Sequence, residues 1–236
     1  MRCVFILFLL TPYLFQAQDY EVIDVIDKIG QNSVLAILQD EAGFIWLGTI
    51  DGLYRYDGSN VMTFRYQQND ENCICGNQVL DIVNDHNGSL WIATRSCLNK
   101  LNLNDYSFTH YFHDESNDNS ISENHNSRLE FINDNLYVLT EKGLDVYNPE
   151  KDVFSNFRLP NSSERSFFHK IDSTQLLIST PSDIFVFNAL NETFNLIEDL
   201  YDISYEHKNI DQAFVRNQEL FITYPCLLYT SDAADE

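Results

Sequence analysis

Basic residues are scarce in this chain. Its 236 residues include 14 Lys and Arg against 36 Asp and Glu, which gives a formal net charge of −22 at pH 7. A surface this acidic repels phosphate backbones and anionic lipid headgroups, so we expect neither nucleic acid nor a membrane surface as a partner. The alternative interpretation is that the acidic residues simply keep an aromatic-rich domain in solution.

The chain also lacks the long apolar run of a membrane-spanning helix. Its one extended apolar stretch, residues 4–15, follows Arg2 and precedes the small residue Ala17, which is the order of a secretory signal peptide. This stretch is too short to span a bilayer. We therefore predict a signal peptide over residues 1–18 and no membrane insertion apart from it. An uncleaved anchor is the alternative, because Phe15 is bulky close to the expected cleavage site.

Cysteines are few, and their spacing matches no metal site. Of the five, Cys3 lies in the leader and Cys226 near the end of the chain, which leaves Cys73, Cys75 and Cys97. No CxxC pair and no Cys/His spacing typical of zinc occurs, so we expect no metal and no cofactor. A disulfide between Cys75 and Cys97 is one expectation for an exported protein, and three reduced, partly buried thiols are the other.

What the chain does contain is an internal repeat. The stretch DEAGFIWLGTIDGL, residues 40–53, returns 45 residues later in divergent form. The recurring positions carry chemically distinct residues: Asp40, Gly43, Trp46, Thr49 and Leu53 reappear as Asp85, Gly88, Trp91, Thr94 and Leu98. A shared offset over so many positions indicates a duplicated unit. Weaker copies occupy residues 129–157 and 167–197, and a fifth begins at residue 213.

Each copy is predicted to form four short antiparallel strands. In the first copy these are residues 34–39, 44–49, 53–56 and 61–65, and the first of them is apolar enough for burial on both faces. Four strands per repeat are typical of a β-propeller blade. The predicted fold class is therefore all-β, an incomplete propeller of about four and a half blades within residues 19–224. Residues 225–236 break the pattern and resemble translated sequencing-adapter sequence, so we expect an artefactual tail there.

The recurring residues have structural roles in this scheme. We expect Trp46 and Trp91 to fill the space between adjacent blades, because a residue required once per blade is required by packing. The repeated glycines set the turns and the register of the strands, and the repeated threonines satisfy backbone groups near strand ends. Gly52 gives the first copy a permissive turn before its third strand, and Cys97 replaces it in the second copy.

The first two copies, VLAILQDEAGFIWLGTIDGLYRYDG and VLDIVNDHNGSLWIATRSCLNKLN, resemble the two-component regulator propeller repeat. The resemblance implies the periplasmic sensor region of a bacterial hybrid two-component system, whose parent protein is anchored in the inner membrane and carries a histidine kinase. It also implies an oligosaccharide ligand, and for the parent we expect a homodimer. No kinase motif occurs in this chain, so an extracytoplasmic binding propeller without signalling output is the alternative.

The candidate ligand contacts come from loops. In a propeller, the turns between second and third strands share one face with the links between blades. The turns are residues 50–52, 95–97, 141–143 and 181–183, and the longer links are residues 66–77 and 112–126. Their charged side chains are the ligand-binding candidates: Asp51, Arg95, Glu141, Lys142 and Asp183. Each has the alternative interpretation of a solvated turn residue.

An enzyme is not expected. A sialidase-type Asp box reads Asp-x-Gly-x-x-Trp, whereas the repeat here is one residue longer before the glycine. Glu41, Glu115 and Glu123 lie in expected loops with no identifiable partner, and His110 and His113 lack the spacing of metal ligands. A propeller hydrolase or lyase is therefore the less favoured alternative to a binding module.

Overall fold

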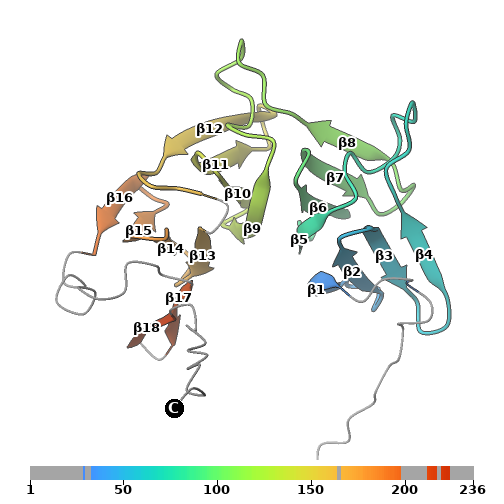
Figure 1. Cartoon of the computed structure of the whole chain (residues 1–236), viewed down its shortest axis with the longest axis horizontal. Helices are drawn as coiled ribbons and strands as arrows, with labels where there is room; N and C mark the ends of the chain where they lie inside the picture. The colour runs from blue at the N-terminus through green and yellow to red at the C-terminus, as the bar shows by residue number, and fades with distance from the viewer. Residues whose placement is uncertain (1–28, 30–32, 164–165, 198–211, 217–218, 224–236) are drawn as a thin grey trace, which may run out of the picture.

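The chain folds as a series of small antiparallel sheets. A computed structural model describes residue 29 and residues 33–163, 166–197, 212–216 and 219–223. Four four-stranded sheets follow one another along the chain, and a two-stranded sheet comes last. Figure 1 shows them side by side in an open arc, with β1, β5, β9 and β13 nearest its centre. The predicted signal peptide (1–18) and tail (225–236) lie outside the described residues.

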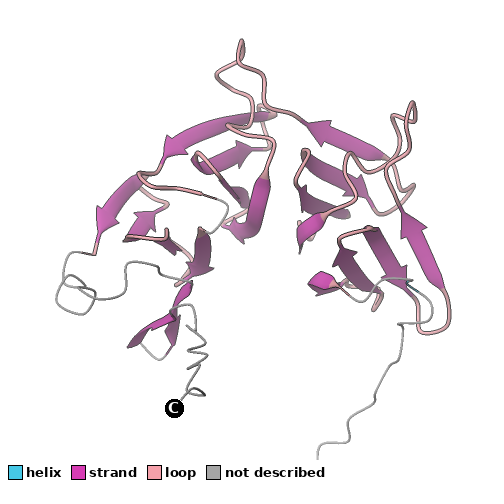
Figure 2. Cartoon of the chain, in the orientation of Figure 1, coloured by secondary structure: helices cyan, strands magenta, loops and turns pink. Residues whose placement is uncertain are grey.

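The strands are short and are joined by turns and loops (Figure 2). The first sheet contains β1 (Val34–Gln39), β2 (Ile45–Thr49), β3 (Gly52–Tyr56) and β4 (Val61–Phe64), and the second contains β5 (Val79–Asn84), β6 (Ser89–Thr94), β7 (Leu98–Asn102) and β8 (Phe108–Tyr111). The third contains β9 (Asn126–Ile132), β10 (Asn135–Thr140), β11 (Gly143–Asn148) and β12 (Val153–Arg158), and the fourth contains β13 (Phe167–Lys170), β14 (Gln175–Ser179), β15 (Ile184–Asn188) and β16 (Thr193–Leu196). The last sheet contains β17 (Gln212–Arg216) and β18 (Glu219–Thr223).

The prediction of an all-β, incomplete propeller of about four and a half blades is confirmed. In every four-stranded sheet the strands pair in chain order, and the arc of sheets does not close. No helix in the described part of the chain is both long and apolar enough to cross a membrane.

The apolar cores lie between successive sheets. Trp46 of the first sheet is fully buried and packs with Ile82, Leu90 and Ile92 of the second. Trp91 of the second sheet packs in the same way with residues of the third, including Leu136. Because each sheet buries its faces mainly against its neighbours, the packing follows the one-dimensional logic of a repeat protein.

The first turn shows why the repeat needs its aspartate and its tryptophan. Asp40 accepts the backbone N–H of Phe44 at 2.9 Å through Oδ1 and the indole N–H of Trp46 at 2.7 Å through Oδ2. Gly43 closes the turn with a φ of 87°, a conformation that costs little without a side chain. The turn therefore fixes both the start of β2 and the orientation of the buried indole.

The apolar run of β1 predicts burial on both faces, and this prediction is wrong. Ile37 is 70% exposed and Leu35 is 43% exposed, whereas Ile82 at the equivalent position of β5 is 4% exposed. The difference arises because β5 lies between β1 and β9. Within the described residues, β1 has a neighbouring sheet on the β5 side only.

Candidate ligand-binding face

The turns between second and third strands are built alike in all four large sheets. A threonine hydroxyl at the end of the second strand donates to the backbone oxygen three residues later. The pairs are Thr49 with Gly52, Thr94 with Cys97, Thr140 with Gly143 and Thr180 with Asp183, at 3.0, 2.7, 3.2 and 3.3 Å. The first hydroxyl also accepts the N–H of Asp51 at 3.0 Å. These bonds set the direction of each turn that carries a candidate ligand residue.

The second of these turns differs from the first in how it is held. Gly52 has a φ of 135°, and a Cβ there would lie 2.7 Å from the backbone oxygen of Phe64, so only glycine fits. Cys97 stands at the equivalent place and forms a disulfide with Cys75, which ties its turn to the link before β5. Of the two expectations for these cysteines, the Cys75–Cys97 disulfide is therefore the one confirmed, and Cys73 is a free, buried thiol.

The links between sheets are anchored by polar residues on the third and fourth strands. In the second sheet, Asn99 Oδ1 accepts the backbone N–H of Cys75 at 2.9 Å. Nε2 of His110 lies 2.8 Å from the backbone oxygen of Cys73. Between these two contacts, Ile74 is fully buried in the core that joins the first two sheets.

The third sheet repeats this anchor with other residue types. Asp145 accepts the N–H and the hydroxyl of Ser122 at 2.8 and 2.9 Å, and Asn156 donates to the backbone oxygen of Ser120 at 3.1 Å. Ile121 takes the buried place between them. Desolvation of its carboxyl raises the pKa of Asp145 from 3.8 to about 6, although the serine and asparagine donors oppose the shift.

The sequence contains a signal for this anchor that the repeat analysis missed. The pattern Asn-x-Ile-x-x-Asn at residues 72–77 recurs at residues 119–124, displaced by 47 residues rather than 45. The last asparagine of each copy accepts a backbone N–H at the start of its own link, at 2.8 and 2.7 Å. The last asparagine therefore closes each link on itself, and the link is anchored to the sheet that comes after it.

Two of the predicted ligand residues, Asp51 and Asp183, pair locally. Asp51 forms an ion pair with Arg65 at 2.7 Å, in which both side chains are 46% exposed. Asp183 Oδ2 accepts a hydrogen bond from Asn161 at 2.9 Å and another from Ser182 at 2.7 Å. These carboxylates lie in different turns, and no contact among the described residues brings them to one site.

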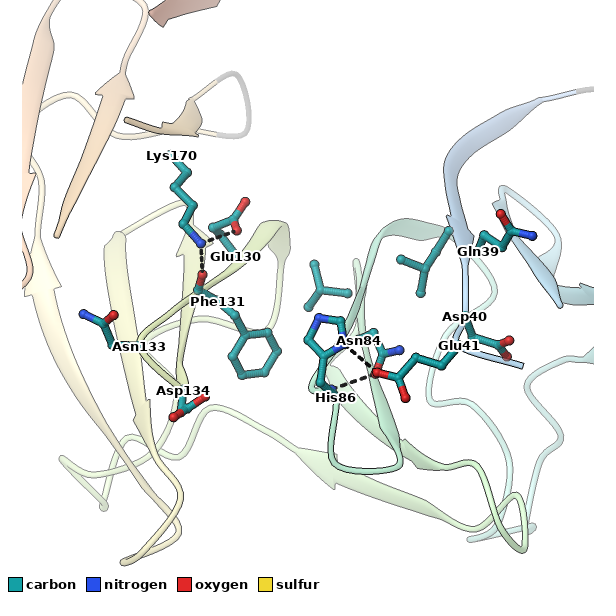
Figure 3. A pocket seen from close by; sticks show the side chains of 12 residues that line it. Gln39, Asp40, Glu41, Asn84, His86, Glu130, Phe131, Asn133, Asp134 and Lys170 are labelled. Atoms are coloured by element: carbon teal, nitrogen blue, oxygen red, sulfur yellow. Dashed lines mark hydrogen bonds and ion pairs between the residues drawn. The ribbon is translucent and has the colours of Figure 1, made fainter. Parts of the chain in front are cut away.

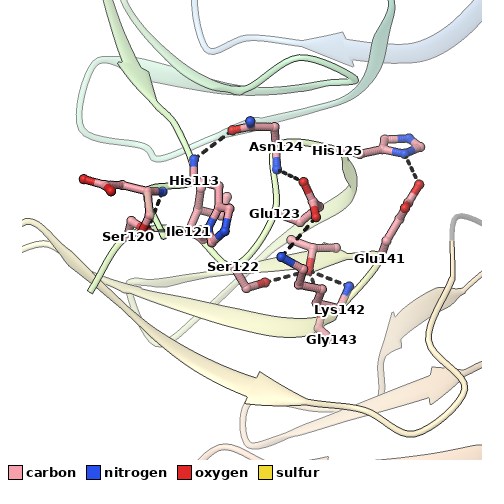
Figure 4. Close-up of polar contacts among 12 residues, drawn as sticks. His113, Ser120, Ile121, Ser122, Glu123, Asn124, His125, Glu141, Lys142 and Gly143 are labelled. Carbon is pink, nitrogen blue, oxygen red and sulfur yellow. Dashed lines mark hydrogen bonds and ion pairs between the residues drawn. The ribbon is translucent and has the colours of Figure 1, made fainter. Parts of the chain in front are cut away.

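Glu141 and Lys142, two more of the predicted residues, contact the link before β9 (Figure 4). Glu141 pairs with His125, whose side chain is 14% exposed, and Lys142 pairs with Glu123 at 3.2 Å. The backbone N–H of Asn124 and the Lys142 partner hold the pKa of Glu123 below its usual value, against the desolvation that raises it. The two charged residues thus hold the link to the turn.

Arg95, the remaining predicted residue, lines a cavity of about 250 Å³ at the start of the innermost strands. Its wall also includes Leu35 of β1, Leu80 of β5, Arg128 of β9 and Phe167 beside the start of β13. We call this the central cavity, because four sheets contribute to it. Of the five predicted ligand residues, it contains Arg95 alone.

The central cavity is basic in an otherwise acidic chain. Arg128 donates to the backbone oxygen of Leu80 at 3.4 Å, and its guanidinium lies 4.9 Å from the ring centre of Phe167. His125 lines the same wall, and no Asp or Glu of the described residues does. Sequence reasoning missed Arg128 and His125, because a basic residue in a strand and a histidine in a link resemble ordinary surface residues.

The opposite ends of the innermost strands form a second hollow, of about 490 Å³ (Figure 3). Nδ1 of His86 lies 2.8 Å from Glu41, and Lys170 donates to the backbone oxygen of Phe131 at 2.7 Å and lies 3.6 Å from Glu130. These contacts link neighbouring sheets. Across the residues described, no group of three His, Cys, Asp or Glu side chains is arranged to hold a metal ion.

The fold and its turn-and-link face define this chain as a β-propeller segment, and comparison identifies the repeat. Residues 28–51 and 73–96 match the two-component regulator propeller family, so the resemblance seen in the first two copies is confirmed. No curated protein matches the sequence.

Two solved structures, with TM-scores of 0.72 and 0.59, share the fold. The extracellular domain of a putative hybrid two-component system from B. thetaiotaomicron is 20% identical, with a TM-score of 0.72 over 86% of this chain and 29% of that one. A second such domain from B. thetaiotaomicron is 16% identical, with a TM-score of 0.49 over 84% of this chain and 35% of that one. A streptogramin B lyase is 12% identical, with a TM-score of 0.59 over 81% of this chain and 62% of that one. The chain therefore spans about a third of the first two domains.

Proposed function

We propose that this chain is part of the extracytoplasmic, periplasmic sensor region of a hybrid two-component system and that it binds an oligosaccharide. The observation that carries the proposal is the pair of two-component regulator propeller repeats within a fold similar to the extracellular domain of such a system. The signal peptide predicted for residues 1–18 supports export, and the histidine kinase would belong to the rest of the parent protein, which we expect to be dimeric.

The central cavity is the place we propose for the ligand. It lies on the face that carries the turns and links, where propeller loops are free to differ while the strands keep the scaffold. Arg95 and Arg128 line it, and a guanidinium group carries several N–H donors for the oxygen atoms of a ligand. Sugar hydroxyl and carboxylate oxygens are acceptors of this kind.

We propose binding without catalysis. The buried carboxyls of Asp81 and Asp145 both have raised pKa values because of desolvation, which is a property of many catalytic acids. Each is nevertheless occupied by structural donors: Asp81 accepts the N–H of Leu129 at 2.8 Å and Asp145 accepts the N–H of Ser122. Their raised pKa values therefore follow from their part in joining sheets and links.

The source gene gives the direct test. Sequencing it past the codon for Tyr224 is expected to show further propeller repeats, one membrane span and a histidine kinase in the same reading frame. A reading frame that instead enters a different catalytic domain, or stops after the repeats, would reject the sensor function. A different catalytic domain would favour an enzyme, and a stop after the repeats would favour a binding propeller without signalling output.

A further inference from the structure

Another hollow of the turn-and-link face lies where the link between the first two sheets packs on the second sheet. It has a volume of about 680 Å³, and the residues that line it come from the link before β5, the β6–β7 turn and the end of β8. We call it the rim groove. Its lining includes Tyr66, Gln67, Asn69, Glu71, Ser96 and Phe112. Unlike the central cavity, which four sheets line, it is lined by the link before β5 together with the turn and outer edge of the second sheet.

The walls of the rim groove are held in place by a disulfide and by hydrogen bonds to the backbone. The Cys75–Cys97 disulfide joins the link to the β6–β7 turn. Asn72 accepts the backbone N–H of Phe108 at 2.8 Å, and the backbone oxygen of Cys73 lies 2.8 Å from His110. A ligand entering this groove would therefore lose little affinity to the ordering of loops.

Two aromatic rings are exposed in the groove. Tyr66, which follows β4, is 51% exposed, and Phe112, which follows β8, is 52% exposed, although large aromatic side chains bury much of their surface in most proteins. Beside them, the side chains of Gln67, Asn69 and Glu71 make no hydrogen bond within the described part of the chain. The groove thus combines apolar ring faces with unpaired amide and carboxylate groups.

The repeat provides an internal comparison. The equivalent hollow between the second and third sheets has a volume of about 260 Å³. Strand register places His113 there at the position of Tyr66 and Arg158 at the position of Phe112. What recurs between the two hollows is the scaffold of the links, so the aromatic pair is not required by the fold.

We propose that the rim groove binds an uncharged sugar chain. A pyranose ring has a C–H face that packs on an aromatic ring and hydroxyl groups at its edge that both donate and accept hydrogen bonds. Tyr66 and Phe112 supply the ring faces, and Gln67, Asn69 and Glu71 supply the polar partners. No Lys or Arg of the described residues lines the groove, so an anionic sugar lacks the counter-charge that it would find in the central cavity.

The proposal shares its ligand class with the proposed function but concerns a separate site, and calorimetry distinguishes the two. The purified chain, kept dilute, would be titrated with neutral hexasaccharides of glucose, xylose, mannose, galactose and arabinose and with hexagalacturonate. The groove variants are Tyr66→His and Phe112→Arg, which place in the groove the residues that the equivalent hollow already carries. Arg128→Ala tests the central cavity, and Met62→Ala, a change at an exposed position of β4, is the matched control.

We expect at least one neutral hexasaccharide to bind, with its Kd weakened about tenfold by either groove variant and unchanged by Met62→Ala. Circular dichroism checks that each variant keeps its strands. Neutral-sugar binding that survives both groove variants and is lost in Arg128→Ala would overturn the rim groove and leave the proposed function standing. If no sugar chain of the series binds, both the groove proposal and the oligosaccharide ligand are rejected.

Discussion

Asp145 and Asn99 occupy equivalent positions on the third strands of successive sheets and hold equivalent links. One position therefore accepts either a carboxyl or an amide. The carboxyl carries a cost that the amide does not, because desolvation favours its neutral form and raises its pKa to about 6. The folded state then holds this proton more tightly than the unfolded state, so stability falls as the pH rises from about 4 to about 6 and is level above that.

Asp145→Asn is expected to remove this pH dependence. Above pH 6 the variant should have a free energy of unfolding that is higher by roughly 1–3 kcal/mol, because no charge is buried. Urea unfolding at a series of pH values measures the difference in the free energy of unfolding between the variant and the unmodified chain. Asp81, whose pKa is also raised, is present in both chains and does not contribute to this difference. Asn99→Asp is the matched reciprocal variant and should introduce a similar slope. If the free energies of unfolding of Asp145→Asn and the unmodified chain changed with pH in parallel, this explanation would be contradicted.

The links between sheets are the elements that shape the ligand-binding face. Each has a buried isoleucine, Ile74 or Ile121, between two backbone contacts to the sheet that comes after it. A buried side chain at this place couples the position of the link to the core between two sheets. The shapes of the rim groove and of its equivalent hollow depend on that coupling.

Ile121→Ala should destabilise the chain by about 2–5 kcal/mol, because it removes a fully buried side chain and leaves a cavity between two sheets. Ile50→Ala is the control: Ile50 is 44% exposed in the β2–β3 turn, and its loss should cost less than about 0.5 kcal/mol. Chemical denaturation gives both values. Equal costs for the two variants would show that the link is not packed as described.

The elements that the sequence predicts well are those whose interactions are local. The Asp-x-x-Gly-x-x-Trp spacing predicts the β1–β2 turn because Asp40 accepts hydrogen bonds from both Phe44 and Trp46 within one hairpin. The link anchors were missed because they join residues far apart in sequence, such as Cys75 and Asn99. Of the central cavity's lining the sequence predicted Arg95, whereas Arg128 was missed for the same reason, since Arg128 and Leu80 come from different sheets and only the fold brings them together.

At the scale of the whole molecule, the innermost strand of the first sheet exposes two apolar side chains. Ile37 and Leu35 are exposed, while the equivalent Ile82 of the second sheet lies in a core between sheets. Uncovered apolar faces and strand edges promote association. We therefore expect the isolated chain to self-associate as its concentration rises.

A pair of equivalent substitutions tests this prediction. Ile37→Lys should reduce self-association with little effect on the denaturation midpoint, because the side chain is already 70% exposed. Ile82→Lys should unfold the chain, because it buries an unpaired charge at a site that is 4% exposed. Sedimentation velocity and denaturation report the two effects. A strong loss of stability in Ile37→Lys would mean that this face is covered.

The most direct measurement of the central claim, that the turn-and-link face binds the ligand, is hydrogen–deuterium exchange of the chain with and without an oligosaccharide that binds it. We predict slower exchange in residues 66–77, 95–97 and 112–128, which surround the rim groove and the central cavity. Protection confined to the opposite turns, residues 40–44, 85–88 and 133–134, would contradict the account. Unchanged exchange throughout would contradict it equally.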